Sequence, residues 1–287
     1  MSTPFISIIT ACYNSSATIK DTIESVLDQT YHNIEYILID GDSEDNTVSI
    51  IKSYKEFFKL KGINYRWISE KDNGIYDAMN KGLSLVHGEW IVFIGSDDYY
   101  KNNKVLENTI SNLNHAKSNN IKYVYGKIEH VNNKKELIEI SGEPWQKQKE
   151  RFPYIMNINH SGSFHHKTLF TIHGKFNDTF KIAGDYEFLL RELKNEVNNA
   201  LFIENILIIM REGGISSTLS NRLNLVRESQ KARKINKINS FSKELTYWKL
   251  RVRIILIISF LFGDKCSSIL ADFYRKVILG KQKRWTN

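Results

Sequence analysis

Four short apolar runs alternate with helical patterns over the first hundred residues, and this alternation limits the fold more than any other feature. The runs cover residues 5–10, 34–39, 63–68 and 90–94. Between them, apolar side chains recur at helical spacing. Strands that are apolar throughout and are separated by helices form a parallel sheet covered on both faces. The sequence therefore predicts an α/β fold with a Rossmann-like, mainly parallel sheet flanked by helices.

The pattern changes after residue 98. We expect a helix over 104–115, a hairpin from 122–130 and 137–140, an irregular stretch over 142–160, a helix over 182–193, a strand over 200–210, and one or two long helices from about residue 220. The expected domains are thus a body over 1–219 and a helical extension over 220–287.

Charge is spread unevenly along the 287 residues. The net charge is +8, but residues 221–287 hold 16 basic and 4 acidic residues, so the remainder has 24 basic and 28 acidic residues and a net charge of −4. A basic extension on an acidic body favours an anionic surface as its partner. Only two cysteines are present, which excludes a disulfide framework and a cysteine-rich zinc site and fits a reducing compartment. We expect neither a signal peptide nor a transmembrane helix.

Polar residues follow all four predicted strands of the first half, in residues 10–14, 40–43, 69–74 and 96–98. Ligands of open parallel sheets bind at the carboxyl ends of the strands. The chain has no GxGxxG after its first strand, no GxxxxGK[ST] and no GxSxG. A nucleotide would therefore bind without the usual glycine-rich phosphate loops.

Asp97 and Asp98 follow the fourth apolar run directly. Two adjacent carboxylates at the end of a buried strand are costly without a counter-charge. A hard cation such as Mg²⁺ or Mn²⁺ supplies that charge, takes oxygen ligands and binds substrate phosphates. The alternative is a surface turn in which an aspartate caps the next helix.

Five blocks of sequence, in order, resemble glycosyltransferase family 2. They are residues 5–14, 25–31, 35–47, 72–82 and 88–98, and a weaker match continues through 159–164, 183–191 and 213–216. The resemblance implies a GT-A fold, a sugar nucleotide as donor, inversion at the anomeric carbon and a divalent metal, Mn²⁺ or Mg²⁺. Many members read Asp-Ser-Asp-Asp where this chain has Gly95, which puts the donor subclass in doubt more than the activity.

The same resemblance assigns residues 1–100 to donor binding. Asp40 would accept the imide N–H of uracil or thymine, and Asp98 would bind the metal with Asp97 beside the ribose or the metal's waters. The alternative for Asp42 and Ser43 is an ordinary turn. The alternative for Lys81 is a position on a solvated helix face. The full set of expected donor contacts is Thr10, Tyr13, Asn14, Asp40, Asp42, Asp72, Gly74, Asp77, Asn80, Lys81, Ser96 and Asp97.

Residues 101–219 would bind the acceptor. Asp185 matches the acid that similar enzymes place at a helix start beside the acceptor, so it is the expected general base, with a helix N-cap as its alternative role. Glu187 competes for the same role. His160 would contact the acceptor or complete the metal shell, or else be a core histidine, and Trp145 would stack on an acceptor sugar or anchor its loop.

In the extension, residues 247–285 combine apolar runs with Lys, Arg and Trp, as interfacial helices do. We therefore expect peripheral membrane contact, with a helical pair packed on the body or a homo-oligomer contact as the alternative. Nucleic acid is not an expected partner.

The sequence thus favours a metal-dependent inverting glycosyltransferase. It would move a sugar from a nucleoside diphosphate sugar, UDP first, to a glycan or lipid-linked acceptor. The expected setting is bacterial surface polysaccharide synthesis at the cytoplasmic face of the membrane. A sugar-phosphate nucleotidyltransferase is disfavoured because residues 10–16 lack a glycine-rich basic loop. A non-catalytic nucleotide-sugar-binding or scaffold protein remains the other alternative.

Overall fold

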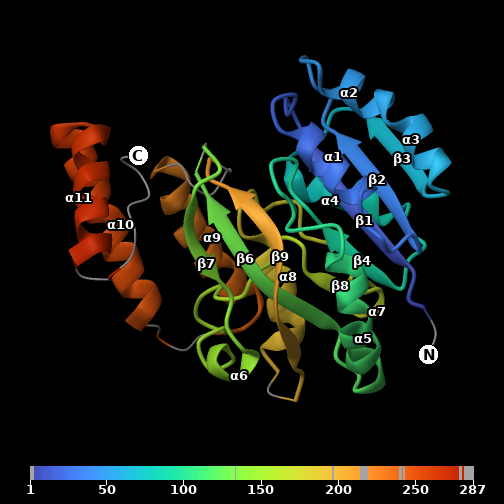
Figure 1. Ribbon diagram of the computed structural model, residues 1–287. Helices are drawn as coiled ribbons and strands as arrows, with labels where there is room; N and C mark the ends of the chain where they lie inside the picture. The colour runs from blue at the N-terminus through green and yellow to red at the C-terminus, as the bar shows by residue number, and fades with distance from the viewer. Residues whose placement is uncertain are drawn as a thin grey trace.

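The computed structural model describes residues 3–132, 134–195, 197–213, 219–238, 241, 243–277 and 280. Its sheet follows the order β3-β2-β1-β4-β8-β6-β9-β5, with β7 paired to β6 (Figure 1). The strands are β1 (Ile6–Cys12), β2 (Ile34–Asp40), β3 (Asn64–Ser69), β4 (Trp90–Phe93), β5 (Tyr99–Tyr100), β6 (Tyr123–Val131), β7 (Leu137–Ser141), β8 (Phe164–His166) and β9 (Ala200–Arg211).

The first four strands are parallel, as predicted. β1 pairs with both β2 and β4, and β3 pairs with β2, all in parallel register. The connecting helices are α1 (Ile19–Leu27), α2 (Thr47–Ser53), α3 (Lys55–Leu60) and α4 (Ile75–Leu83). The apolar spacing around residues 48–58 indicates one helix, but the structure divides it at Tyr54 into α2 and α3.

The second half of the sheet is mixed. β8 lies antiparallel between β4 and β6, β9 runs parallel to β6, and β5 pairs antiparallel with β9. The predicted hairpin is confirmed as β6 and β7. The apolar pattern did not predict β5 and β8, which are two and three residues long, because such short segments carry no readable alternation. It also missed two short helices, α6 (Trp145–Gln148) and α7 (Thr168–His173).

A separate apolar core covers each face of the sheet. One joins alternate β1 residues such as Ile6 and Ile8 to α1, α2, α3 and α5 (Val105–Ser118). The other joins Ile9 to α4 and to α8 (Gly184–Leu193). The alternation follows from the strand's period of two. Helices on both faces fix the strands, and the loops at their carboxyl ends are thereby held in place.

Three helices follow in the predicted extension: α9 (Leu219–Ile235), α10 (Lys243–Phe262) and α11 (Asp264–Val277). α9 packs on α8, and Ala232 is part of the core on that face of the sheet. Figure 1 shows α10 and α11 side by side at the opposite end of the molecule from α2 and α3. The predicted extension therefore has two parts: α9 packs on the body, whereas α10 and α11 form a pair with exposed apolar side chains. Of the predicted membrane segment, residues 247–285, the structure describes residues 247–277 and residue 280.

Within the residues that the structure describes, no helix is both long enough and apolar enough to span a bilayer.

Glu35 ties the amino ends of the central strands together. Its carboxylate is fully buried and accepts bonds from Ser7 Oγ at 2.6 Å, His87 N at 2.6 Å and Arg66 Nη2 at 2.5 Å. These partners come from β1, β3 and the turn before β4. Although burial acts to raise the pKa of Glu35, the bonds from Ser7 and His87 leave it below its usual value.

Replacing Glu35 by alanine removes the acceptor and leaves buried donors without a partner. We expect Glu35→Ala to lower the free energy of unfolding by about 3–5 kcal/mol, measured by denaturant titration. The matched control is Glu56→Ala, an exposed glutamate on α3, which should change stability by no more than about 0.5 kcal/mol. Equal stability of the two variants would contradict the role given to Glu35.

Candidate active site

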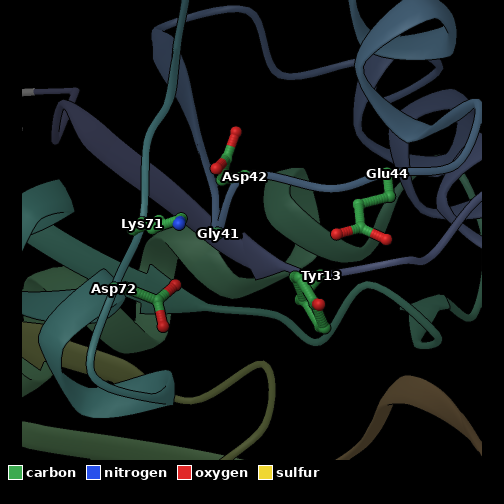
Figure 2. Close-up of a pocket in the computed structure, with 6 residues that line it drawn as sticks. All are labelled: Tyr13, Gly41, Asp42, Glu44, Lys71 and Asp72. Carbon is green, nitrogen blue, oxygen red and sulfur yellow. The ribbon is translucent and has the colours of Figure 1, made fainter.

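A pocket of about 320 Å³ opens at the carboxyl ends of β1, β2 and β3. Figure 2 shows its residues grouped around the backbone at Gly41, from the three loops that follow these strands. The Tyr13 ring is 60% exposed and so presents a flat apolar surface. The pocket is lined by Tyr13, Gly41, Asp42, Glu44, Lys71 and Asp72. Polar residues that follow β1, β2 and β3 therefore lie together, as the sequence predicts.

Asn14 and Ser15 bind these loops to one another. Asn14 Oδ1 accepts from the amide of Glu44 at 3.0 Å, and the Asn14 amide donates to Ser43 Oγ at 2.8 Å. Ser15 Oγ lies 2.8 Å from Ser96 Oγ and so connects the β1 loop to the β4 loop. Asn14 thus supports the pocket rather than lining it.

Asp40 and Thr10 are buried beneath the pocket. Asp40 is 1% exposed, and its two oxygens accept from Ser43 Oγ at 2.5 Å, Ser43 N at 3.0 Å and Ser69 Oγ at 2.7 Å. Thr10 Oγ1 accepts from the buried Tyr36 hydroxyl at 3.1 Å. Direct base contact was expected of both residues. In the structure their polar atoms face protein partners, and the acids that line the pocket are Asp42, Glu44 and Asp72.

Side chains of the loop after β3 and of the following helix α4 fix this loop. Asp72 Oδ1 accepts from the Gly74 amide at 2.8 Å, and Asp77 Oδ2 accepts from the Asn73 amide at 2.9 Å. Lys81 Nζ donates to Lys71 O at 2.6 Å and pairs with Glu70 at 2.9 Å. Lys81 and Asp77 therefore shape the loop.

Asn80 lies further along α4 and serves a different contact. Its side chain exchanges two hydrogen bonds with the Phe176 backbone, at 2.9 and 3.0 Å. The structure therefore places Asn80 between α4 and the segment before α8, and it is not among the residues that line the pocket.

Asp97 and Asp98 form the electrostatically strained part of the site. Asp98 is 4% exposed; its carboxylate accepts from Ser161 Oγ at 2.6 Å, and its carbonyl accepts from Thr22 Oγ1 at 2.7 Å. Burial, followed by the charge of Asp97, raises the pKa of Asp98 to about 7. Burial also raises the pKa of Asp97. The ionised pair is thus unfavourable without a nearby cation.

Arg211, which the sequence analysis did not select, provides part of that positive charge. It lies at the end of β9, donates to Asp97 O at 3.0 Å and forms an ion pair with Asp21. Its guanidinium also stacks over the Tyr99 ring, 4.8 Å from the centroid. Its charge counteracts the raised pKa values of Asp97 and Asp98. No sequence motif links Arg211 to these acids, which are more than a hundred residues away.

The two carboxylates fit a divalent cation. A Cβ on Gly95 would lie 2.8 Å from Asp97 Oδ1 and 3.0 Å from Asp98 Oδ2, so the absent side chain leaves room for both carboxylates to converge. Among the described residues, no group of three or more His, Cys, Asp and Glu side chains could hold a metal. Of the described residues, Asp97 and Asp98 would then hold the cation, which leaves positions for phosphate oxygens and water, as is usual for Mg²⁺.

His160 does not join that metal group, contrary to one of the two expected roles. Its ring stacks on Phe93 at 5.7 Å and packs edge-on against His165 at 5.0 Å. Burial lowers the pKa of His160, and the nearby Asp185 carboxylate partly offsets this. Its Nε2 is buried without a hydrogen-bond partner. His160 therefore lies within reach of the charge of the expected base, while its neighbour Ser161 contacts Asp98.

Asp185 lies in the first turn of α8. Its Oδ1 accepts from the Tyr76 hydroxyl at 3.1 Å and from the Tyr186 amide at 2.8 Å. Tyr76 also donates to Ile182 O at 2.8 Å. A Cβ on Gly184 would lie 2.7 Å from the Tyr76 ring, so glycine allows α8 to approach α4 closely. Among described residues, the hydrogen bonds to Asp185 use Oδ1, which leaves Oδ2 for a substrate.

Glu187, the competing base, is already occupied. It is buried, forms a bidentate ion pair with Arg191 and accepts from Asn236 Nδ2 at 3.2 Å. Trp145 is also unsuited to stacking on an acceptor sugar, the first of its two expected roles. Its ring is 2% exposed and packs edge-on against Phe152 at 5.6 Å, so it anchors the loop and presents no face to a sugar.

The family profile described as "Glycosyl transferase family 2" matches residues 7–176. A PGL/p-HBAD biosynthesis glycosyltransferase of Mycobacterium bovis is 26% identical over 225 residues, covering 77% of this chain and 83% of that protein. A putative teichuronic acid biosynthesis glycosyltransferase, TuaG of Bacillus subtilis, is 35% identical over 102 residues, covering 36% of this chain and 39% of that protein.

Two solved structures share the fold. One is S. aureus TarS 1–349 in complex with UDP-GlcNAc, with a TM-score of 0.61 and 18% identity over 94% of this chain and 77% of that one. The other is the mannosyltransferase PcManGT from Pyrobaculum calidifontis in complex with GDP-Man and Mn²⁺, with a TM-score of 0.63 and 12% identity over 96% of this chain and 76% of that one.

The raised pKa of Asp98 predicts how stability depends on pH. Because Asp98 titrates near 3.8 when unfolded and at about 7 when folded, burying its charge destabilises the protein increasingly from pH 4 to pH 7. In chelated buffer, Asp98→Asn should gain about 1–3 kcal/mol over wild type between pH 5 and pH 8, measured by denaturant unfolding. The exposed Asp178→Asn is the matched control. A difference that shrank as pH rose would contradict the assignment.

Proposed function

Because the chain belongs to glycosyltransferase family 2 and has a GT-A fold, we propose that it transfers a sugar from a nucleoside diphosphate sugar to a glycan or lipid-linked acceptor, with inversion at the anomeric carbon. One observation carries the proposal: residues 160 and 161 connect the two ends of the site. Ser161 binds Asp98, and the adjacent His160 lies beside Asp185. A leaving group and an attacking hydroxyl therefore have separate sites close together.

The pocket at the strand ends is the proposed nucleoside site. The exposed Tyr13 ring offers a stacking surface, and the carboxylates of Asp42, Glu44 and Asp72 accept N–H and hydroxyl donors. UDP is the favoured nucleotide, and GDP is the second candidate because structures of similar fold hold UDP-GlcNAc and GDP-Man. Asp40 acts from below by fixing Ser43 and Ser69.

The diphosphate would lie at Asp97 and Asp98, which would hold Mn²⁺ or Mg²⁺ between them and the phosphates. A divalent cation there supplies positive charge that stabilises the departing diphosphate. Arg211 keeps Asp97 in place through its backbone carbonyl, and Ser161 orients one oxygen of Asp98. Gly95 leaves the space that both carboxylates need.

The acceptor hydroxyl would bind between Asp185 and His160. Its oxygen forms the bond to the anomeric carbon, the bond from that carbon to the phosphate oxygen breaks, and the nucleoside diphosphate leaves with the electron pair. The proton passes to Asp185 Oδ2. General-base catalysis of this kind raises the rate about 10²–10⁴-fold. Tyr76 fixes the carboxylate through Oδ1.

The α10–α11 pair is the proposed contact with an anionic phospholipid surface. Exposed apolar side chains lie on both helices, with Phe260 at 89% and Phe262 at 69% exposure. Basic residues such as Lys249, Arg251 and Arg253 lie on the same helix as these phenylalanines. Apolar and basic side chains together complement an anionic membrane interface. We infer a peripheral position at the cytoplasmic face of the membrane.

A lipid-linked acceptor would account for that surface. Relatives named for PGL/p-HBAD and teichuronic acid biosynthesis support a role in bacterial surface polysaccharide synthesis. The acidic pocket and the absence of a glycine-rich basic loop in residues 10–16 disfavour a sugar-phosphate nucleotidyltransferase, which must take a triphosphate.

Donor turnover tests the proposed function. We expect one sugar nucleotide from a panel of UDP-, GDP- and dTDP-sugars to bind and turn over with Mn²⁺ or Mg²⁺, and to lose turnover with chelator and in Asp98→Ala. Asp185→Asn should keep nucleotide binding within about twofold and lower kcat about 10²–10⁴-fold, because it removes only the base. Calorimetry measures the binding and product analysis measures the turnover.

Each alternative has its own outcome in that assay. Metal-dependent binding without turnover, even with extracted lipid-linked acceptor, would favour a non-catalytic binding protein. Release of pyrophosphate from a nucleoside triphosphate and a sugar phosphate would favour a nucleotidyltransferase. No metal-dependent binding of any sugar nucleotide would overturn the transferase proposal.

Vesicle co-sedimentation tests the membrane contact. Wild type should bind phosphatidylcholine vesicles more tightly when they contain phosphatidylglycerol, and less tightly as salt rises. The double variant Phe260→Ser and Phe262→Ser should bind at least about tenfold more weakly, because each side chain contributes about 1.5–3 kcal/mol on burial.

The matched control is Phe57→Ser with Leu60→Ser, which are also exposed but lie on α3 at the other end of the molecule. Equal loss in both double variants would contradict the assignment of the surface. A concentration-dependent dimer that bound no vesicles, and that Phe260→Ser with Phe262→Ser dissociated, would favour the homo-oligomer contact instead.

A further inference from the structure

Glu228, in the middle of α9, accepts hydrogen bonds from three consecutive backbone amides. Its Oε1 accepts from Lys181 N at 2.9 Å, and its Oε2 accepts from Ile182 N at 2.8 Å and Ala183 N at 2.9 Å. A carboxylate has only acceptor atoms, and a row of adjacent N–H groups is therefore its natural complement. The contact spans 45 to 47 residues of sequence.

These amides immediately precede α8, which begins at Gly184 and carries Asp185 in its first turn. The first N–H groups of a helix lack partners within the helix, and a negative charge near them is favourable. Ala183 is the N-cap residue of α8, whose start has no side-chain cap hydrogen bond, and Glu228 accepts the Ala183 amide together with the amides of the two residues before it. The carboxylate on α9 thus fixes the backbone two residues before the proposed base.

The opposite side of the segment is held by the loop after β3 and by α4. Lys181 Nζ donates to Asn73 O, and Tyr76 donates to both Ile182 O and Asp185 Oδ1. The segment 181–185 is therefore clamped between the proposed donor half and α9. If the α9 side were released, the side-chain hydrogen bonds that still join this segment to other described elements would be those with Asn73 and Tyr76, beside the packing of Ala183 in the core.

We propose that Glu228 is a positioning residue for the transfer reaction, which acts through the backbone of 181–183 to keep Asp185 aligned with the acceptor hydroxyl. The inference rests on the proposed role of Asp185 as base, and it assigns a reaction role to a helix of the extension. α9 also packs against α10 through Val226, so the helix that fixes the base contacts the proposed membrane hairpin as well.

Hydrogen exchange followed by peptide mass spectrometry tests the contact without relying on activity. In Glu228→Ala, the amides of 181–183 should exchange at least about tenfold faster than in wild type, because each loses its acceptor. Arg227→Ala, an exposed neighbour on the same helix, should leave their exchange unchanged. Unchanged protection in Glu228→Ala would overturn the proposal, even if no sugar donor had been found.

Kinetics separate positioning from general structural support. Glu228→Ala should lower kcat about 10–100-fold, the cost of a misplaced catalytic group, and leave the dissociation constant for the nucleoside diphosphate within about twofold. Glu228→Gln keeps one oxygen acceptor and should recover most of kcat; it also serves if the alanine variant does not fold. Arg227→Ala should behave as wild type.

Two results would overturn the proposal. One is a kcat in Glu228→Ala equal to that of Arg227→Ala. The other is a parallel loss of nucleotide binding and thermal stability, which would show general support of the fold. A wild-type protein that transfers no sugar would instead overturn the proposed function, and the hydrogen-exchange result would still decide whether Glu228 fixes the segment.

Discussion

The burial of Asp98 beside the half-buried Asp97, in the loop after β4, is the constraint on which the site depends. Asp98 cannot ionise easily beside Asp97 in a site that is nearly closed to water. The surrounding structure reduces this cost without removing it: Ser161 donates to Asp98, and Arg211 holds the backbone of Asp97. The unfavourable energy that remains is what the proposed divalent cation would relieve.

The protein surrounds this pair with segments that are distant in sequence. The β1, β2 and β3 loops form the pocket, residues 160–161 connect Asp98 to the surroundings of Asp185, and α9 fixes the approach to α8. Parallel strands gather the loops at one edge of the sheet. The antiparallel insertion of β8 between β4 and β6 then brings the second half of the chain to the same edge.

Sequence reasoning succeeded where a local pattern determines the outcome. The four parallel strands, the β6–β7 hairpin and the pocket at the strand ends all follow from apolar periodicity and from the polar residues that end each strand. The contacts of the polar side chains at these strand ends depend on more than the local pattern. Thr10 and Asp40 lie near the ends of β1 and β2, and their polar atoms bond to Tyr36 and Ser69, because partners from neighbouring elements decide the direction of a short polar side chain.

The sequence by itself determined the family, the α/β architecture and the acids at the strand ends, because these depend on periods and motifs that a few adjacent residues express. Only the tertiary structure decided that the hydrogen bonds of Asp185 among the described residues use Oδ1, while Glu187 is paired with Arg191. It also decided that Glu228 reaches residues 181–183. It also showed that α9 packs both on the body and against α10, whereas α10 and α11 expose apolar side chains. The physical reason is that burial, ion pairing and the satisfaction of backbone amides arise from contacts between distant segments, and no local pattern encodes them.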